Sequence, residues 1–235
     1  MMANTTQNRQ NGFTLVEVLI ALALGGVVMA AVMLSFRGQH ATYIAQDHTV
    51  EMQQNIRVAL DMVSREIRSA GFPGAGQAQQ GLGFTISNSP SRLVFSRVGD
   101  DGNVECVMYD QYDSASTQSP VLGRVRSNVA WAGGDCNLAT LHAGKSPLAE
   151  NIEEAEFLYL LADGTATTAP DVNDLDNIRA VVVSLLARAG QPDPRFNSGG
   201  NAIEYVSAGG TMWLRDDNTR RRLLIHTIHG RNLGL

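Results

Sequence analysis

The chain begins with a polar block that is followed by a long apolar block. Residues 1–12 are polar, and from Val18 to Phe36 the chain has 19 residues without a charge, closed by Arg37. At about 1.5 Å per residue, such a helix would span most of the hydrocarbon core of a bilayer. One acid, Glu17, stands at the head of this run. A charge inside a membrane helix costs roughly 2.5–3.5 kcal/mol on insertion scales, so it indicates a function.

After Arg37 the helical period continues, but polar residues fill the positions between the apolar ones. The apolar residues recur mostly three, four or seven positions apart, which places them on one stripe; they are Tyr43, Val50, Ile56, Leu60, Val63, Ile67 and Ala70. Gly71 followed by Pro73 is a stop signal. We therefore predict one helix from Thr14 to Ala70, with a first half suited to an apolar environment and a second half suited to packing on a sheet.

From Phe72 onward the pattern changes to short strands separated by turns. Alternating or β-branched apolar runs predict six strands, at Arg92–Val98, Val104–Tyr109, Val121–Val129, Glu156–Leu161, Ile178–Leu186 and Arg221–His229. The first two form a hairpin candidate, Ile178–Leu186 is apolar enough to be central, and Asp163-Gly164 marks a turn before it. Loops are expected at Gly74–Gly83 and Gly190–Asn201.

The fold class predicted from these patterns is α+β. A long N-terminal transmembrane and amphipathic helix would pack on a C-terminal antiparallel β-sheet domain. The expected division is residues 1–12 as a leader, 13–36 as the transmembrane half of the helix, 37–71 as its amphipathic half and 72–235 as the β-rich domain.

Besides a leader at residues 1–12 that is cut off before the apolar run, two other interpretations of the N-terminal segment are open. One is a conventional signal peptide cleaved near Ala30-Ala31, and the other is a plain single-pass anchor. Both explain the apolar run, but neither explains Glu17 at its head. A signal peptide would also have more than one positive residue before the run, where this chain has Arg9 alone.

The charge and the cysteines narrow the class of protein further. The net charge of the full chain is −5 and becomes −6 without residues 1–12, so nucleic acid is not an expected partner. Cys106 and Cys136 belong to no CxxC pair, which disfavours a zinc site. If the domain lies outside the cytoplasm, a disulfide bond between them is favoured, and two buried free thiols are the alternative.

Few other residues suggest chemistry, and no serine, cysteine or histidine constellation supports an enzyme. His226 and His229 would point to opposite faces of one strand, and Trp131 and Trp213 are expected to anchor a core or an interface. No cofactor is expected. The weak exception is a calcium site in an acidic loop that departs from EF-hand spacing, formed by Asp171, Asn173, Asp174 and Asp176.

The hexapeptide Gly12-Phe13-Thr14-Leu15-Val16-Glu17 resembles the processing site of type IV prepilins and of type II secretion pseudopilins. The resemblance implies that a prepilin peptidase cuts after Gly12 and methylates the new N-terminal Phe13. It also implies that Glu17, the fifth residue of the mature chain, pairs with the positive N-terminus of a neighbouring subunit and sets the register of assembly.

Later segments are similar to the minor pilins of the PilW type. The resemblance rests on the end of the helix, on the central strand and on the C-terminal strand, at residues 55–72, 179–188 and 221–232. The J-type pseudopilins share the general layout. Two features depart from the major pilins: Leu34 stands where many of them have proline, and the closing disulfide near their C-terminus is missing. The chain is also longer than most major pilins, and this length together with the missing disulfide favours a low-copy subunit.

The function that this resemblance implies is a minor pilin that helps to initiate, prime or cap type IV pilus assembly within a minor-pilin complex. Its expected partners are the prepilin peptidase, other minor pilins, the major pilin and the assembly platform of the inner membrane. The expected location is the bacterial inner membrane with a periplasmic domain, and then the pilus fibre or cell surface. The alternatives are a J-type pseudopilin of type II secretion and, from another class, a membrane-tethered adhesin or binding module.

Overall fold

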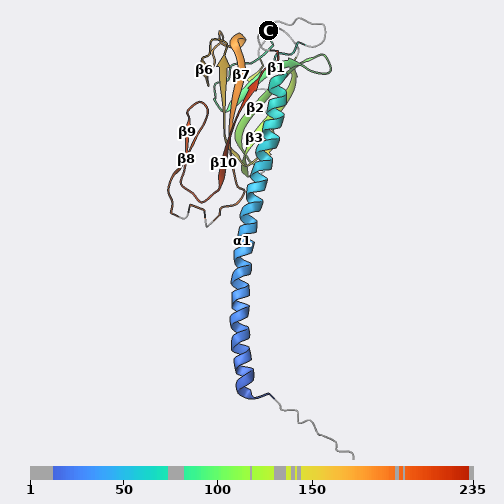
Figure 1. Cartoon of the computed structure of the whole chain (residues 1–235). Coiled ribbons are helices and arrows are strands. Elements are labelled where there is room, and N and C mark those ends of the chain that lie inside the picture. The colour runs from blue at the N-terminus through green and yellow to red at the C-terminus, as the bar shows by residue number, and fades with distance from the viewer. Residues whose placement is uncertain are drawn as a thin grey trace, which may run out of the picture. The chain divides into compact units, whose positions relative to one another are not determined.

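The structure is a computed structural model of the chain, which describes residues 13–73, 82–116, 118–129, 136–138, 141, 144–193, 196–197 and 199–232. It divides into two units, Met1–Asp47 and His48–Leu235. Figure 1 shows the elements, whose bounds are α1 Leu15–Arg68, β1 Arg92–Val98, β2 Val104–Ser114, β3 Ser119–Val129, β4 Ser146–Glu150, β5 Ile152–Leu161, β6 Ala166–Thr167, the 3₁₀ helix η1 Leu175–Asn177, β7 Ile178–Arg188, β8 Ile203–Val206, β9 Met212–Arg215 and β10 Arg221–His229.

The helix α1 begins and ends within two residues of the bounds that the sequence predicts. It runs without a break through Gly25, Gly26 and Gly38, although glycine is a weak helix former. After its last turn Gly71 adopts a φ of 71°, which glycine tolerates, and the Gly71 N–H donates to the carbonyl of Ser96 at 3.0 Å. The predicted stop signal is therefore confirmed.

The part of α1 in the second unit buries one face in the core that it shares with the sheets. The buried residues recur three or four positions apart, as a stripe requires, and are Met52, Ile56, Ala59, Leu60, Val63, Ile67 and Ala70. Two members of the predicted stripe were wrong. Tyr43 and Val50 are 69% and 50% exposed and do not belong to the core, whose first residue on α1 is Met52.

The first sheet has the order β1-β2-β3-β4, and all its neighbouring strands are antiparallel. β1 and β2 form the predicted hairpin, and the weaker prediction for β3 is also confirmed. β2 continues five residues beyond the prediction, to Ser114, because those residues pair with β3. β4 was not predicted from the sequence. A single residue, Asn151, separates it from β5 and turns the chain into the second sheet with a φ of 59°.

The second sheet has the order β10-β7-β5-β6. β7 lies between β10 and β5, and all its residues except Arg179 and Arg188 are buried, which confirms it as the central strand. The predicted turn at Asp163-Gly164 is present, and Gly164 has a φ of 87°. It leads into the two-residue strand β6 and then η1, and not directly into β7 as the sequence suggested.

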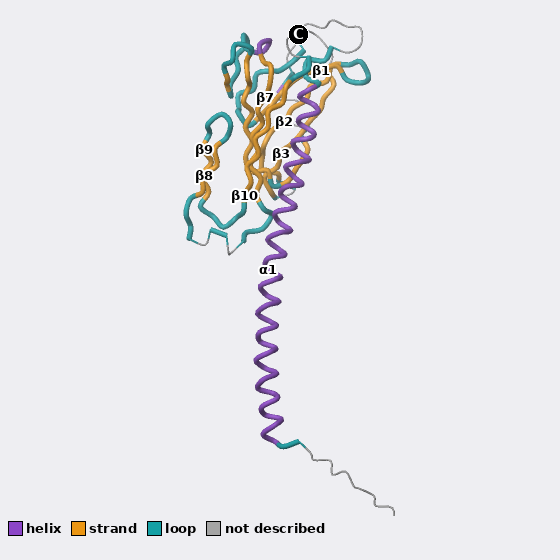
Figure 2. The backbone as a smooth tube through the Cα atoms, in the orientation of Figure 1, coloured by secondary structure: helices purple, strands orange, loops and turns teal. Residues whose placement is uncertain are grey.

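A third sheet, the hairpin of β8 and β9, was missed because strands of four residues are too short to show alternation. Figure 2 shows this hairpin set off from the strands of the two larger sheets. Its turn is held by buried polar groups of the second sheet. The N–H of Gly209 donates to Glu156 at 2.7 Å, the Thr211 hydroxyl donates to the other Glu156 oxygen, and the N–H of Ala208 donates to Ser184 at 3.0 Å.

The structure describes one of the two tryptophans that the sequence predicts to be anchors. Trp213 of β9 is 8% exposed, as expected for a core anchor. Trp131 lies outside the described residues, and so does most of the predicted loop Gly74–Gly83.

A disulfide bond joins Cys106 of β2 to Cys136, across a sequence separation of 30 residues. Both sulfurs belong to a second apolar cluster, which is separate from the core that contains α1. Leu138 and Leu141 pack in the same cluster. The disulfide therefore holds Cys136 and the described residues that follow it against one face of the first sheet. This is the face opposite to the one that packs in the core with α1.

The last strand returns to the end of α1. Ile228 of β10 belongs to the same core as the helix residues. Beyond the strand, the N–H of Arg231 and the side-chain amide of Asn232 both donate to the carbonyl of Arg68, each at 3.4 Å. The fold class predicted from the sequence, a long N-terminal helix packed on antiparallel sheets, is confirmed.

Replacing both Cys106 and Cys136 by alanine should lower the melting temperature by roughly 6–15 °C, because the bond removes about 3–4 kcal/mol of unfolded-state entropy. The measurement is thermal unfolding of the full chain in detergent. Thiol labelling after unfolding without reductant is the control, and two reactive thiols in the wild-type chain would contradict the pairing.

Candidate functional site

Thr14 caps the N-terminal end of α1. Its hydroxyl oxygen accepts the N–H of Glu17 at 3.3 Å, and its carbonyl accepts the N–H of Val18 at 3.2 Å. A threonine followed three residues later by glutamate is the capping-box pattern, and a carboxylate in the first turn is stabilised by the positive end of the helix dipole. The local sequence thus fixes the start of α1 directly after Phe13. Gly12, the predicted cleavage residue, lies outside the described residues.

The apolar side chains in the first part of α1 are uncovered. Phe13 is 85% exposed, Leu19 57% and Leu34 70%. By length and composition, α1 is the one helix in the described part of the chain that is suited to cross a membrane. Within that part, the Glu17 carboxylate has no hydrogen-bonding or ionic partner. This segment is therefore suited to surroundings of lipid or of other apolar helices, in which an unpaired carboxylate would be costly.

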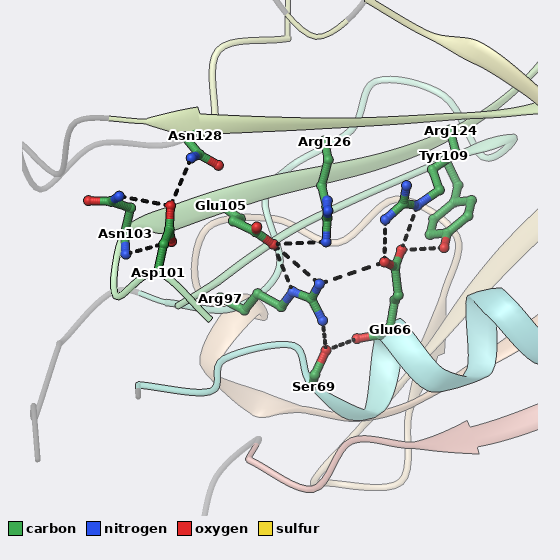
Figure 3. A network of polar contacts seen from close by, with 10 residues as sticks. All are labelled: Glu66, Ser69, Arg97, Asp101, Asn103, Glu105, Tyr109, Arg124, Arg126 and Asn128. Atoms are coloured by element: carbon green, nitrogen blue, oxygen red, sulfur yellow. Dashed lines mark hydrogen bonds and ion pairs between the residues drawn. The ribbon is translucent and has the colours of Figure 1, made fainter. Parts of the chain in front are cut away.

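A second carboxylate, Glu66, is buried where α1 packs on the first sheet, as Figure 3 shows. Arg124 of β3 donates to it from Nε at 3.0 Å and from Nη2 at 2.5 Å, and the hydroxyl of Tyr109 of β2 donates to the same carboxylate. Two parallel hydrogen bonds between a guanidinium and a carboxylate fix both groups in orientation as well as in distance. Glu66 therefore locks α1 to two adjacent strands.

Arg97 of β1 extends this network to a third strand (Figure 3). Its Nη2 lies 3.7 Å from Oε1 of Glu66 and 3.2 Å from Oε2 of Glu105, and its Nη1 donates to the Ser69 hydroxyl at 2.7 Å. Glu105 also lies 3.7 Å from Nη1 of Arg126. The buried carboxylate of the helix is thus compensated by charge from the sheet, as burial requires.

The ionisation of the network follows from these contacts. Burial raises the pKa of Glu66, but the hydrogen bonds from Arg124 and Tyr109 and the charges of Arg124 and Arg97 outweigh it, so the pKa lies below its ordinary value. Burial and the Glu66 charge raise the pKa of Tyr109. At neutral pH Glu66 is therefore a carboxylate and Tyr109 a neutral donor, which suits a structural lock.

A comparable network ties β10 to β5. The side chain of Arg221 is 2% exposed, and it contacts Glu153 at 2.5 Å and Asp217 at 2.6 Å. Arg215 of β9 lies 3.2 Å from Glu153. Burial raises the pKa of Glu153, but the hydrogen bond and charge of Arg221 outweigh it and hold the pKa low; a hydrogen bond from Arg221 lowers the pKa of Asp217.

In the acidic loop that the sequence suggested for calcium, side-chain oxygens accept hydrogen bonds from backbone N–H groups of the same loop. Asp171 Oδ1 accepts the N–H of Asn173 at 2.7 Å and that of Asp174 at 3.2 Å, while Asp174 Oδ2 accepts the N–H of Asp171 at 2.9 Å. The carbonyl of Asp176 accepts from Arg179 at 2.8 Å. Over the described residues, no three His, Cys, Asp or Glu side chains are grouped to hold a metal ion.

Sequence reasoning missed the Glu66 network, although one signal was present. Glu66 stands inside the buried stripe, next to Ile67 and three positions after Val63. An acid at such a position requires a cation from the surface on which the helix packs. The identity of that cation was hidden, because Arg97 and Arg124 come from strands 31 and 58 positions further along the chain.

One comparison with known proteins agrees with the N-terminal features, and two others report similar proteins. A family model described as the prokaryotic N-terminal methylation motif matches residues 7–33, which confirms the prepilin-type N-terminus expected from the sequence. The pilin-like protein PilA3 of Thermus thermophilus is 26% identical over 172 residues, which cover 69% of this chain and 72% of that protein. A type IV-like pilin of Thermus thermophilus aligns in structure with a TM-score of 0.49 and 16% identity, covering 78% of this chain and 98% of that one.

Changing Glu66 to alanine should lower the free energy of unfolding by about 3–5 kcal/mol, because it leaves the mostly covered guanidinium of Arg124 without its carboxylate partner. Asp61→Asn is the matched control on the same helix. Its ion pair with Arg65 is exposed, so a loss below about 1 kcal/mol is expected. Denaturant unfolding of the full-length protein measures both, and equal losses would refute the role given to Glu66.

Acid should destabilise the domain through the same carboxylates. Folding lowers the pKa values of Glu66, Glu153 and Asp217, so their contribution to stability is complete above the ordinary values of 4.5 for Glu and 3.8 for Asp and is lost as the pH falls through the lowered folded values. We expect the melting temperature to fall steeply below about pH 4.5. The slope should be shallower in Glu66→Gln, and an unchanged slope would exclude Glu66 as a contributor.

Proposed function

We propose that this chain, which carries the N-terminal methylation motif at residues 7–33, is a minor pilin that helps to initiate, prime or cap type IV pilus assembly within a minor-pilin complex. Its role would be structural and not catalytic. The observation that carries the proposal is the uncovered apolar part of α1, which begins shortly after the expected cleavage site and is headed by Glu17. The Glu17 carboxylate has no partner among the described residues.

The proposed sequence of events follows from the chemistry of this end of the chain. The apolar helix anchors the precursor in the inner membrane with its β-domain on the periplasmic side. A prepilin peptidase cuts after Gly12, and Phe13 then carries a new amino group. Removal of the polar leader leaves an N-terminus that can enter an apolar bundle of helices.

Glu17 would supply the specific contact in that bundle. In apolar surroundings an unpaired carboxylate is costly, and so is an unpaired amine. Pairing the Glu17 carboxylate with the amino group of a neighbouring subunit removes both costs at one relative position of the two helices. The ion pair would therefore select the register more than it adds net stability.

The presence of Glu17 also supports a place within the complex and below another subunit. A subunit at the extreme tip has no neighbour above it whose amine requires an acid. A subunit that keeps the acid is suited to receive one. Pairwise crosslinking of the minor subunits would show its order relative to them.

Changing Glu17 to alanine or glutamine should leave leader cleavage intact and reduce incorporation into fibres roughly tenfold or more, because it removes one partner of a buried ion pair. Immunoblots of sheared pili against whole cells measure this. Glu51→Gln, at an exposed acid later on α1, is the matched control. Normal incorporation of the Glu17 variants would refute the assembly contact.

The mature N-terminus gives an independent test of processing. Mass spectrometry should find a chain that begins with methylated Phe13. A Gly12→Val variant should keep its leader, because a branched side chain would fill the space that glycine leaves at the cut site. A chain that instead begins near Ala30-Ala31 would indicate a conventional signal peptide and overturn the proposal.

A further inference from the structure

Two hollows lie next to each other on the surface of the second unit, beside the C-terminal end of α1. The first, of about 280 Å³, is bordered by Arg57 and His226, and the second, of about 460 Å³, by Phe72 and Arg231. Both are bordered by the same pair of helix residues, Arg65 and Arg68. We name this surface the arginine groove.

The arginine groove concentrates positive charge on an acidic protein. It carries four arginines and one acid, while the whole chain has a net charge of −5. The acid, Asp61, pairs with Arg65 at 2.5 Å, and both side chains are about 70% exposed. Arg57, Arg68 and Arg231 form no ion pair within the described residues.

These arginines differ from the others on which the fold depends. The side chains of Arg97, Arg124 and Arg221 are mostly covered, and each is held by carboxylates of the same chain. Arg57 and Arg68 are exposed on α1 and face away from the core. Neighbouring guanidinium groups repel one another, and carboxylates placed between them would remove that cost.

We propose that the arginine groove binds a carboxylate-bearing segment of a neighbouring pilin subunit, an inference that rests on the proposed function. Arginine binds carboxylates through two parallel hydrogen bonds, which gives such a contact a defined geometry. Asp61 lies among the arginines and would repel a continuous run of phosphates. A protein surface can place an acid at each arginine and leave Asp61 opposite a neutral group, and this favours a protein partner over a nucleic acid.

The direct test is photo-crosslinking in cells that make pili. A photo-crosslinking amino acid is placed at position Arg65 of the full-length chain, and the product is identified by mass spectrometry. We expect a crosslink to another pilin subunit, at a peptide that contains Asp or Glu. Arg57→Glu combined with Arg68→Glu should reduce its yield at least tenfold, and Arg57→Gln combined with Arg68→Gln should reduce it less.

Two controls separate charge from folding. Arg222→Glu reverses an exposed arginine of β10 that does not border the groove, so it should leave the yield unchanged. All variants should keep the wild-type melting temperature within a few degrees, since their side chains make no core contact. Changing the crosslinked acid of the partner to lysine should restore the yield in the Arg57→Glu, Arg68→Glu chain.

The outcomes that overturn the inference differ from those that overturn the proposed function. If the subunit enters fibres but position 65 crosslinks to no pilin, or if the charge reversals leave the yield unchanged, the groove inference fails and the function stands. If a labelled DNA duplex binds the full-length protein in detergent and only this binding is lost on reversal, the groove binds a polyanion instead. If the wild-type subunit is absent from fibres and from minor-pilin complexes, the proposed function fails.

Discussion

The packing of α1 on the first sheet depends on the hydrogen bonds and ion pairs of one buried carboxylate, that of Glu66. It places a charge of the helix inside the surface that the helix and the first sheet share. Side chains from three strands contact this carboxylate: Arg97 from β1, Tyr109 from β2 and Arg124 from β3. Apolar stripes can slide along a sheet at moderate cost, but a bidentate ion pair is satisfied at one position only. The network therefore specifies the position of α1 along the first sheet and its rotation about the helix axis.

Two acids of α1, Glu66 and Glu17, differ in whether the described chain supplies a cation for them. Glu66 finds its cations within its own chain and is fully compensated. Glu17 finds none in the described residues, and the apolar residues that follow it are uncovered. The part of α1 that contains Glu66 is thus compensated within its own chain, whereas the apolar part that follows Glu17 is left uncovered. The proposed role as a pilus subunit would use this division, because the first part holds the domain together and the second part is free to contact lipid or other helices.

Much of this organisation was predictable from the sequence, because it is encoded by local patterns. The uncharged run, the stop at Gly71 and the apolar strand that became β7 each depend on neighbouring residues. The hairpin of β8 and β9 was not predictable in this way, since it is held by Glu156 and Ser184 of distant strands. The arginine groove was equally hidden, because Arg65 and Arg231 come together only when the residues after β10 pack beside α1. Contacts between distant positions depend on topology, and periodicity carries no information about them.

The meeting of the two ends of the domain has a consequence for synthesis. Residues at the end of α1 are made early, yet Arg68 receives hydrogen bonds from Arg231 and Asn232, and Ile228 of the last strand lies in the same core as Ile67. A growing chain therefore carries an apolar helix face that cannot be fully covered until β10 has been made. Until then that apolar surface stays exposed, and transiently exposed apolar surface of this kind is what chaperones bind. A truncation that removes β10 would leave the helix face partly uncovered.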